Sequence, residues 1–240
     1  MENRISLLKT DHVDATPKFR IKIPTVGEIL EDEQSYYSDI HALTAVPYQY
    51  MVQLDDMGID YTTLTDFDLF MLLFPIHAQK GLPLIFSDLD VSGYVPNIED
   101  GNKYLYNDRL GDDYKIDEFV YMQIVSTIRK INDLERVRYK PANDEAKRYL
   151  LEKERRKLKR NARKPYEPYL EKLVIALVNK SDFKYDYDSV MDLSIYKFNS
   201  SFKQISTSIN YDNTMIGVYT GNIDTSKISD KSCLSWIPQK

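Results

Sequence analysis

The chain has 240 residues and a net charge of −5; 29% of its residues are charged and 42% are hydrophobic. This length suits one large domain or two modest ones, and this composition suits a sizeable core and excludes wholesale disorder. A single cysteine, Cys233, excludes a disulfide framework and a multi-cysteine zinc site, so a reducing, cytoplasmic environment is expected. The N-terminal residues lack the apolar stretch of a signal peptide. The longest apolar run, residues 69–76, is too short to cross a bilayer, so no membrane partner is expected.

The first predicted element is a strand. Residues 19–23 (FRIKI) alternate apolar and basic side chains, which predicts a short half-buried strand that ends at Pro24. Thr25 and Glu28 have the spacing of a capping box, so a helix is expected to begin there. Its apolar face continues until Pro47 breaks the helix, with Ile29, Tyr37, Ile40 and Thr44.

Two further helices are predicted in this part of the chain. A short one covers the sequence YQYMVQLDDM and stops at Gly58. The next begins at Thr65, with Asp68 at capping-box spacing, and it is apolar on nearly every side, which is typical of a buried helix. Pro75 and Gly81 are expected to end or kink it.

Residues 82–116 have short β-prone runs and glycine turns, which predict a small β-rich insertion. Asp100-Gly101 lies between the runs YVPNI and KYLYN and predicts a hairpin turn. Asp117 then caps a helix with Met122, Val125 and Ile128 near one face, and residues 140–144 form a linker with an N-cap.

Residues 144–164 carry ten Lys or Arg and four Asp or Glu, a net charge of +6, so the rest of this −5 chain carries −11. Leu151, Leu158 and Ala162 give only a thin apolar seam. Three acid–base pairs have the i,i+3 or i,i+4 spacing that neutralises a helix surface: Asp144–Arg148, Glu152–Arg156 and Glu154–Lys157. A long, largely solvated helix that lies lightly on the body is therefore expected.

The cations near the end of this helix are the candidate partner-binding residues: Arg155, Arg156, Lys159, Arg160, Arg163 and Lys164. Three interpretations stay open, namely a solvated self-neutralising helix, a docking surface for an acidic protein, and contact with the phosphates of a nucleic acid. No aromatic residue is interleaved among these six cations, and this lack and the acidic remainder of the chain favour the first two.

Pro168 suits the first turn of a helix whose apolar stripe has five members: Leu170, Leu173, Val174, Leu177 and Val178. After a turn at residues 185–188, apolar residues recur in alternating steps of four and three: Met191, Ile195, Phe198, Phe202, Ile205 and Ile209. This spacing predicts one helical seam, which favours a core helix and leaves a coiled-coil partner surface as the alternative. Phe198 and Phe202 are therefore expected to be buried. Residues 214–223 and 233–237 are expected to be extended or short.

Together these elements predict a mainly α (α+β) fold, a helical body with a small β insertion and short terminal strands. The expected parts are an N-terminal helical part at 1–81, the β-rich insertion at 82–116, and a C-terminal helical part at 117–240 with the basic helix at 144–164. Nineteen tyrosines provide contact area with a polar tip, which suits interfaces as well as cores.

No catalytic, cofactor or metal site is predicted. His12, His41 and His77 lie far apart without metal-binding spacing, and Cys233 has no neighbouring histidine or helix start. No phosphate-binding loop is present. Neighbouring aspartates are expected in turns, caps and surfaces: Asp55 and Asp56, Asp88 and Asp90, Asp112 and Asp113, Asp186 and Asp188. The chain is therefore expected not to be an enzyme.

Four segments together carry a family resemblance: PTVGEILEDEQSYYS (24–38), MVQLDDMGIDYTTLTDFDLFMLLF (51–74), EAKRYLLEKERRKLKR (145–160) and DNTMIGVYTGNID (212–224). Over nearly its full length the chain resembles a group of proteins from phages and prophages of Gram-positive bacteria. That group resembles proteins of the tail-morphogenesis module, in which tail assembly chaperones lie next to the tape-measure protein. These segments are helix caps and apolar faces, so no catalytic residue is carried over.

The resemblance implies a non-enzymatic, tail assembly chaperone-like protein that binds other tail proteins, such as the tape measure or the tail tube, through helical and aromatic surfaces. It would act in the host cytoplasm or remain in the virion. The alternative is a nucleic-acid-binding phage protein that uses the basic helix at 144–164.

Overall fold

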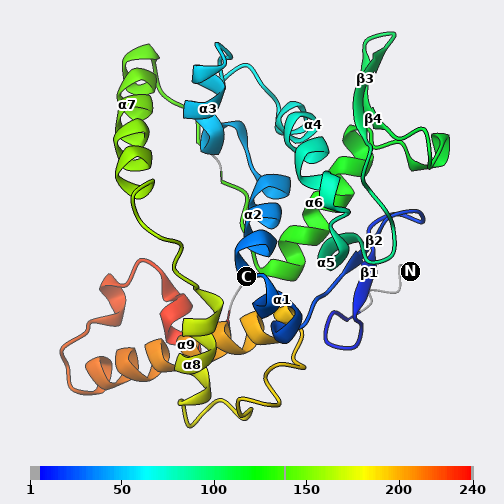
Figure 1. Cartoon of the computed structure of the whole chain (residues 1–240). Helices are drawn as coiled ribbons and strands as arrows, with labels where there is room; N and C mark the ends of the chain where they lie inside the picture. The colour runs from blue at the N-terminus through cyan, green and yellow to red at the C-terminus, as the bar shows by residue number, and fades with distance from the viewer. Residues whose placement is uncertain (1–5, 138, 239–240) are drawn as a thin grey trace.

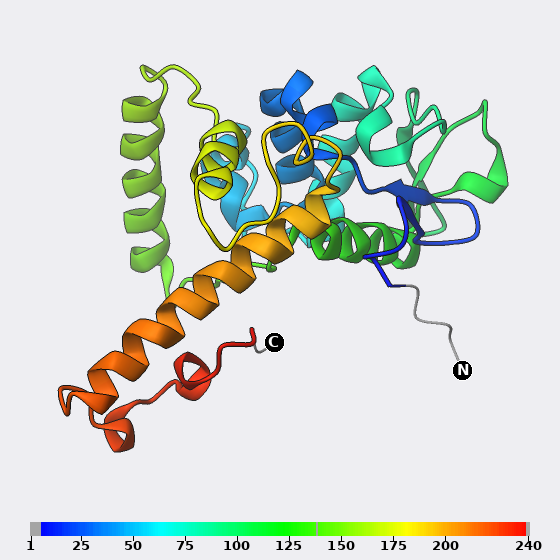
Figure 2. The same cartoon turned by 90° about the horizontal axis from the view of Figure 1, so that it is seen from below.

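The computed structural model describes residues 6–137 and 139–238. Residues 1–5, which belong to the N-terminal stretch considered for a signal peptide, lie outside this description. Helices dominate the described residues, and the strands there form two separate two-stranded sheets. Figures 1 and 2 show a helical body from which α7 (Asp144–Asn161) and the far end of α9 (Ile195–Tyr219) project. The prediction of a mainly α fold with a small β insertion is confirmed.

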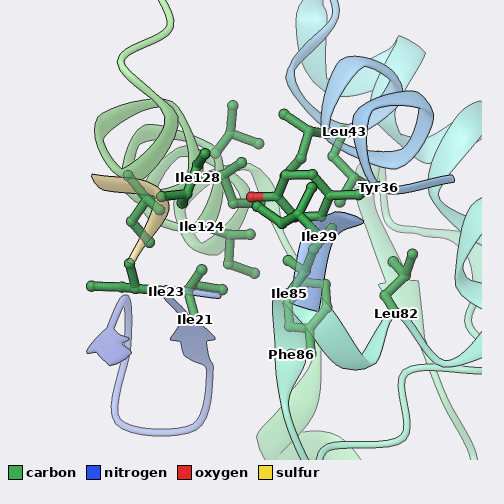
Figure 3. Packing of buried hydrophobic residues seen from close by; sticks show 14 of the residues in the cluster. Ile21, Ile23, Ile29, Tyr36, Leu43, Leu82, Ile85, Phe86, Ile124 and Ile128 are labelled. Carbon is green, nitrogen blue, oxygen red and sulfur yellow. The ribbon is translucent and has the colours of Figure 1, made fainter. Parts of the chain in front are cut away.

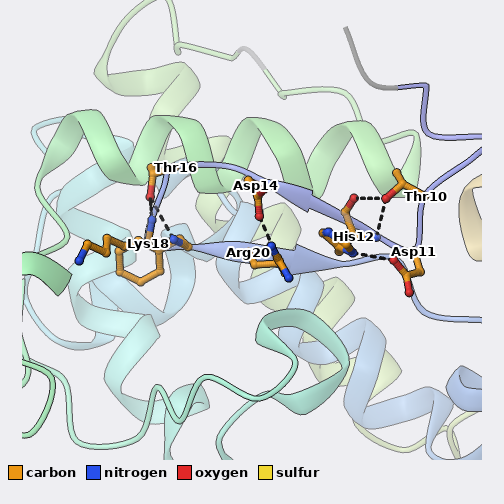
Figure 4. Close-up of polar contacts among 8 residues, drawn as sticks. Thr10, Asp11, His12, Asp14, Thr16, Lys18 and Arg20 are labelled. Carbon is orange, nitrogen blue, oxygen red and sulfur yellow. Dashed lines mark hydrogen bonds and ion pairs between the residues drawn. The ribbon is translucent and has the colours of Figure 1, made fainter. Parts of the chain in front are cut away.

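The strands β1 (His12–Asp14) and β2 (Arg20–Lys22) form an antiparallel hairpin near the N-terminus. Ile21 is buried, while side chains on the outer side bond one another, as Arg20 Nε does to Asp14 Oδ1 at 2.8 Å (Figure 4). The strand predicted at residues 19–23 is confirmed. Its partner is not predicted, because three residues are too few to establish an alternation of apolar and polar side chains.

The helix expected after Thr25 is in fact two helices, α1 (Val26–Glu31) and α2 (Glu33–Thr44). The capping box is confirmed, because the Glu28 N–H donates to Thr25 Oγ1 at 3.2 Å and the Thr25 N–H donates to Glu28 Oε2 at 2.9 Å. The prediction of one continuous helix is wrong. Asp32 leaves the helical conformation with a φ of −151°, and its carboxylate caps the first turn of α2.

The short helix predicted before Gly58 is confirmed. A 3₁₀ turn at Pro47–Tyr50 leads into α3 (Met51–Asp56), and Gly58 follows with a φ of +72°. This left-handed conformation is the one that glycine adopts most easily at a helix end. Pro47 opens the turn after α2, as its fixed φ allows.

The helix α4 (Asp66–His77) begins with the predicted capping box at Thr65. Its buried side chains are mostly aromatic or large: Phe67, Leu69, Phe70, Met71 and Phe74. The prediction of burial on nearly every side is wrong for Leu72 and Ile76, which are exposed. Pro75 lies inside the last turn of α4 and does not end it.

The hairpin predicted within residues 82–116 is confirmed. It pairs β3 (Val95–Glu99) with β4 (Asn102–Tyr106), and Asp100-Gly101 forms its two-residue turn with φ of +49° and +81°. A short helix, α5 (Pro83–Phe86), precedes it and is not predicted. Buried side chains of this segment belong to the main core: Leu82, Ile85, Phe86, Val91, Tyr94, Leu105 and Ile116.

The helix α6 (Glu118–Asn132) is capped by Asp117, as predicted. Its buried stripe is formed by Tyr121, Ile124, Val125, Ile128 and Ile131. Met122 does not belong to this stripe and is exposed, so its placement on the apolar face is wrong. At about 100° per residue, Met122 lies beyond the edge of the stripe.

One large hydrophobic cluster joins the two ends of the sequence. It contains residues from the β1–β2 hairpin, from α1, α2, α4, α5 and α6, and from α8 (Leu170–Val178) and α9. Figure 3 shows part of it, where Tyr36 lies among aliphatic side chains such as Ile29 and Ile128. The Tyr36 hydroxyl donates to Asn132 Oδ1 at 2.8 Å. A smaller cluster lies around α3 and includes Met51, Val52, Leu54 and Tyr61.

Backbone hydrogen bonds also join the start of α1 to the segment before α9. The N–H groups of Val26 and Gly27 donate to the carbonyls of Leu193 and Met191 at 2.8 and 2.9 Å, and the Ile195 N–H donates to the Pro24 carbonyl at 2.8 Å. A Cβ at position 27 would lie 3.1 Å from the Met191 carbonyl oxygen, so this close approach favours glycine.

The stripe predicted for α8 is confirmed, since Leu170, Val174 and Leu177 are buried and Leu173 and Val178 are partly buried. The α9 seam is confirmed for Phe198, which has no exposed surface, while Phe202 is only partly buried.

Two further expectations for this segment are wrong. Met191 precedes α9, which begins at Ile195, and residues 214–219 are helical rather than extended, because α9 continues to Tyr219. Residues 231–234 of the tail form a 3₁₀ turn.

Candidate protein-interaction site

The basic helix α7 lies against α3 through ion pairs. Arg155 reaches two carboxylates of α3, with Nη2 at 2.5 Å from Asp55 Oδ2 and Nη1 at 2.6 Å from Asp56 Oδ1. Near the other end of α7, Lys147 Nζ lies 2.6 Å from Asp60 Oδ2. The hydrogen bond from Lys147, together with those from Thr62, lowers the pKa of Asp60 to about 2. The docking of α7 is therefore largely electrostatic.

The apolar contact of α7 with the body is small. Leu150 and Leu151 pack at the edge of the cluster around α3, and none of the α7 residues is buried. Leu151 thus fits the predicted seam, but Leu158 and Ala162 are exposed, so that part of the seam is wrong. The reason is length: at about 1.5 Å per residue, the six residues of α3 cover only a fraction of the eighteen of α7.

Pairs within α7 neutralise part of its charge. Arg156 lies 3.1 Å from Glu152, and Lys157 lies 3.1 Å from Glu154, as their spacing predicts. In the described part of the chain, no ion pair within 4 Å joins Asp144 to Arg148. Two of the six candidate residues, Arg155 and Arg156, are thus engaged within the molecule.

The other four candidate residues form the end cluster, which is Lys159, Arg160, Arg163 and Lys164. All four side chains are exposed, and none has an ion pair within 4 Å among the residues that the structure describes. α7 ends at Asn161, so Arg163 and Lys164 lie just after the helix. Positive charge also suits the C-terminal end of a helix dipole. The end cluster is therefore the concentrated positive surface of this part of the chain.

The side chain of Glu33 caps the start of α8, and the sequence does not predict this role. Glu33 of α2 is only 7% exposed, and it accepts hydrogen bonds from the Tyr169 N–H at 2.6 Å, the Leu170 N–H at 2.9 Å and the Tyr166 hydroxyl at 2.9 Å. Burial raises the pKa of Glu33, but these hydrogen bonds outweigh it, so the pKa lies below its ordinary value. The sequence signal that could have indicated such a contact is that the residue before α8, Tyr169, cannot cap the helix with its own side chain.

α9 begins in the body and extends away from it, and the tail after α9 runs back beside the helix (Figure 2). Ile195 and Phe198 are buried, whereas Ile216 and Tyr219 near the far end are 61% and 81% exposed. The Gln204 side-chain amide donates to the Trp236 carbonyl at 2.8 Å, which ties the returning tail to α9.

The residues considered for chemistry do not come together. His12 lies 2.6 Å from Asp11, His77 lies 2.6 Å from Asp39, and His41 stacks on Tyr50. The Cys233 thiol donates to the Asp230 carbonyl at 3.2 Å. Across residues 6–137 and 139–238, no three His, Cys, Asp or Glu side chains are grouped as a metal site requires.

Six of the eight neighbouring aspartates have partners among the described residues. Asp55 and Asp56 bind Arg155, Asp90 pairs with Arg109 at 3.4 Å, Asp112 pairs with Lys115 at 3.1 Å, Asp113 pairs with Lys18 at 2.8 Å, and Asp186 accepts from the Ser189 N–H at 2.8 Å. Among the described helices, none combines the length and apolarity needed to cross a bilayer.

Residues 159–239 match the family model described as YomV second domain, a phage-derived family from a Bacillus prophage. The matched segment begins at Lys159 and includes α8, α9 and the returning tail. It therefore contains the whole end cluster and the exposed part of α9. Searches of curated proteins and of solved structures gave no match. The similarity of this last third of the chain to a phage-derived family fits a phage protein.

Proposed function

We propose that this chain is a non-enzymatic phage tail morphogenesis protein, similar to a tail assembly chaperone, that binds other tail proteins through exposed helical and aromatic surfaces. One observation carries the proposal. The segment that is similar to a phage-derived family, residues 159–239, also contains the exposed end cluster and the far part of α9, which projects from the body (Figure 2). The resemblance of residues 24–38, 51–74 and 212–224 to tail-module proteins gives the proposal its tail-specific part.

The physical properties of this segment suit an assembly factor. Such a protein binds a partner temporarily, before that partner joins the assembly. It therefore needs exposed surfaces that are not buried in its own core. The end cluster offers charge, which steers association and sets specificity. The far part of α9 offers apolar and aromatic surface, with Ile216 and Tyr219 exposed. The expected partners are the tape-measure protein and the tail-tube protein, encountered in the host cytoplasm before or during assembly.

The test is co-purification with the tape-measure and tail-tube proteins of the same phage at about 150 mM salt, where charges are screened beyond roughly 8 Å. We expect one of them to be retained by the full chain. A variant that reverses the whole end cluster should weaken this retention, because it replaces four cations by four anions. Its substitutions are Lys159→Glu, Arg160→Glu, Arg163→Glu and Lys164→Glu.

The matched control reverses four exposed lysines outside this surface: Lys9, Lys80, Lys130 and Lys180. It changes the net charge by the same amount, so equal weakening by both variants would mean that bulk charge and not the end cluster is responsible. Failure of both tail proteins to bind the wild-type chain would contradict the proposed function.

The second candidate is nucleic-acid binding by α7. It is favoured by the exposure of the end cluster and by Tyr149, which is exposed on the same helix and could stack on a base. The acidic remainder of the chain, which carries −11 outside residues 144–164, opposes it. Strong retention on DNA that falls with salt would support this candidate.

A further inference from the structure

The apolar seam of α9 continues into the part of the helix that leaves the body. Phe198 is buried, and Phe202 and Ile205 are partly buried against the core. The same alternation of four and three residues then reaches Ile209, Asp212, Ile216 and Tyr219. We call residues 205, 209, 212, 216 and 219 the distal seam. A helix places them on one face, and the exposure of Ile216 and Tyr219 shows that this face is left open at its far end.

The returning tail covers a different side of α9. Gln204 is bonded to the Trp236 carbonyl, and the Ile223 side chain lies directly on Gly217, where a Cβ would clash with it. At about 100° per residue, Gln204 and Gly217 both point away from the distal seam. Gly217 lies in the last turn of α9, and its missing side chain permits this close approach of the tail. The tail therefore leaves the far part of the distal seam, with Ile216 and Tyr219, accessible.

The two projecting helices, α7 and α9, differ in how many charged residues they carry. α7 has twelve charged residues among eighteen, which is expected of a helix that stays in water. Residues 204–223, by contrast, contain a single charged residue, Asp212. Depletion of charge with retention of aromatic and aliphatic side chains is typical of the centre of an interface. The distal half of α9 therefore has the surface of a helix that another protein covers.

Asp212 determines which occupant fits. It lies within the distal seam, and its flanking positions are Ser208, Asn213 and Met215, which carry no charge. A second copy of this chain would place two Asp212 carboxylates in one interface without a cation from α9 to pair with them, because the nearest one, Lys203, is bound to Asp133 at 3.1 Å. An unpaired carboxylate in an interface is costly. A partner with one cation at this position removes that cost.

We propose that the distal seam binds one amphipathic helix of another protein, apolar along its seam and carrying a Lys or Arg opposite Asp212. The inference rests on the proposed function for the source of that helix, a tail protein. The surface itself is defined by the spacing, exposure and charge of α9. The single acidic residue in an uncharged seam acts as a specificity element, as polar residues do at such positions in coiled coils.

A pair of synthetic helical peptides tests the surface directly. Each has about three heptads with leucine along its seam, and the two differ at one central seam position, which is lysine in the first and glutamate in the second. We expect the full chain to bind the lysine peptide at least about tenfold more tightly, about 1.4 kcal/mol, as measured by fluorescence anisotropy. Asp212→Lys should reverse this preference.

Two variants of α9 provide the matched comparison. Ile216→Asp places a charge in the distal seam and should abolish binding of the lysine peptide, whereas Asn210→Asp adds the same charge at an exposed position outside the seam and should leave binding within about twofold. Circular dichroism checks that both remain helical. Equal binding of the two peptides by the wild-type chain and by Asp212→Lys would overturn the proposal.

The remaining outcomes separate this inference from the proposed function. If a tail protein binds the wild-type chain and Ile216→Asp equally, the distal seam is not its site and the inference fails while the function stands. If neither tail protein binds but the lysine peptide does, with the dependence on Asp212 described above, the inference stands and the function fails. Sedimentation showing a wild-type dimer that Ile216→Asp dissociates would place a second copy on the seam and overturn the inference.

Discussion

Glu33 acts as the cap of a helix to which it does not belong. Tyr169, the residue before α8, makes no capping hydrogen bond with its side chain, and the carboxylate of Glu33 receives the first N–H groups of α8 instead. A carboxylate at this position also meets the positive end of the helix dipole. One side chain of α2 therefore positions the first helix that lies wholly within the segment similar to a phage-derived family.

Removal of this cap should destabilise the protein. Glu33→Ala leaves the N–H groups of Tyr169 and Leu170 without their acceptor, so we expect the free energy of unfolding to fall by about 1–3 kcal/mol. Urea denaturation measures it. Glu31→Ala, which changes an exposed glutamate at the end of α1, is the control and should have little effect. Equal losses for both variants would contradict the capping role.

The contribution of Glu33 should also depend on pH. Its pKa in the folded protein is lowered, by hydrogen bonds that outweigh the opposing effect of burial. The stabilisation is therefore fully present above the pKa of an unfolded glutamate, about 4.3, and is lost as the pH falls through the lower folded value. We expect Glu33→Gln to differ most from the wild-type protein near pH 7 and to approach it in acid. Denaturation series at both pH values test this, and a difference that grows toward low pH would contradict it.

Phe198 marks the point where α9 is anchored to the body. It has no exposed surface and its ring packs edge-on against Phe183 at 6.3 Å. Phe198→Ala should therefore lower the free energy of unfolding by about 3–5 kcal/mol, the usual range for truncating a buried aromatic residue. Phe202→Ala, at the partly buried next position of the seam, should cost clearly less. A loss below roughly 1 kcal/mol at Phe198 would mean that this part of α9 is not core.

At the scale of elements, α7 is held by charges more than by packing. Arg155 joins it to Asp55 and Asp56, and no residue of α7 is buried. Because exposed ion pairs contribute about 0–1 kcal/mol, Arg155→Ala should change global stability little. It should instead raise hydrogen exchange along α7, while α9 is unaffected, and salt near 1 M should do the same. Arg156→Ala, which removes only a pair within α7, is the control; unchanged exchange in Arg155→Ala would contradict this docking.

The affinity of the end cluster for DNA decides whether this basic helix is a nucleic-acid-binding arm. With an acidic body behind it, we expect the full chain to bind DNA weakly, at about 10⁻⁴–10⁻⁶ M or above at physiological salt. Reversal of its four cations to glutamate should leave the fold intact, because all four side chains are exposed. The end of α7 should fray somewhat, since the new charges oppose the helix dipole. A sub-micromolar DNA complex that is lost on reversal would show that the arm is real.

For the whole molecule, local signals predicted most elements, and long-range contacts explain most of the misses. Both capping boxes, the Asp100-Gly101 turn and the α8 stripe were predictable because their chemistry lies within a few residues. The cap from Glu33 was not, because the partners of Glu33 lie more than 130 residues away. The break at Asp32 was missed although its cap is local, since the Asp32 carboxylate accepts from the Ser35 N–H. In the candidate site, the exposure of the end cluster followed from its composition. The engagement of Arg155 by α3 did not, since spacing along α7 says nothing about α3.

The same long-range contacts decide whether the segment similar to a phage-derived family is independent. Its buried residues Leu170, Val174 and Phe198 belong to the main core that residues 19–131 also build, and its α8 is capped by Glu33. Backbone bonds from Val26 and Gly27 hold the stretch before α9. A fragment of residues 159–239 would expose those apolar side chains and lose these partners.

We therefore expect the isolated fragment 159–239 to be partly helical but to show no cooperative unfolding, because too little apolar surface is buried within it. Circular dichroism across a urea series measures this, with the full chain as the control that should unfold in one sharp transition. Adding a separately produced fragment of residues 1–158 should restore a cooperative transition if the shared core is what stabilises the segment. A sharp transition in the fragment alone would show instead that α8, α9 and the tail form a unit that folds by itself, and that the contacts of Glu33, Val26 and Gly27 only position it.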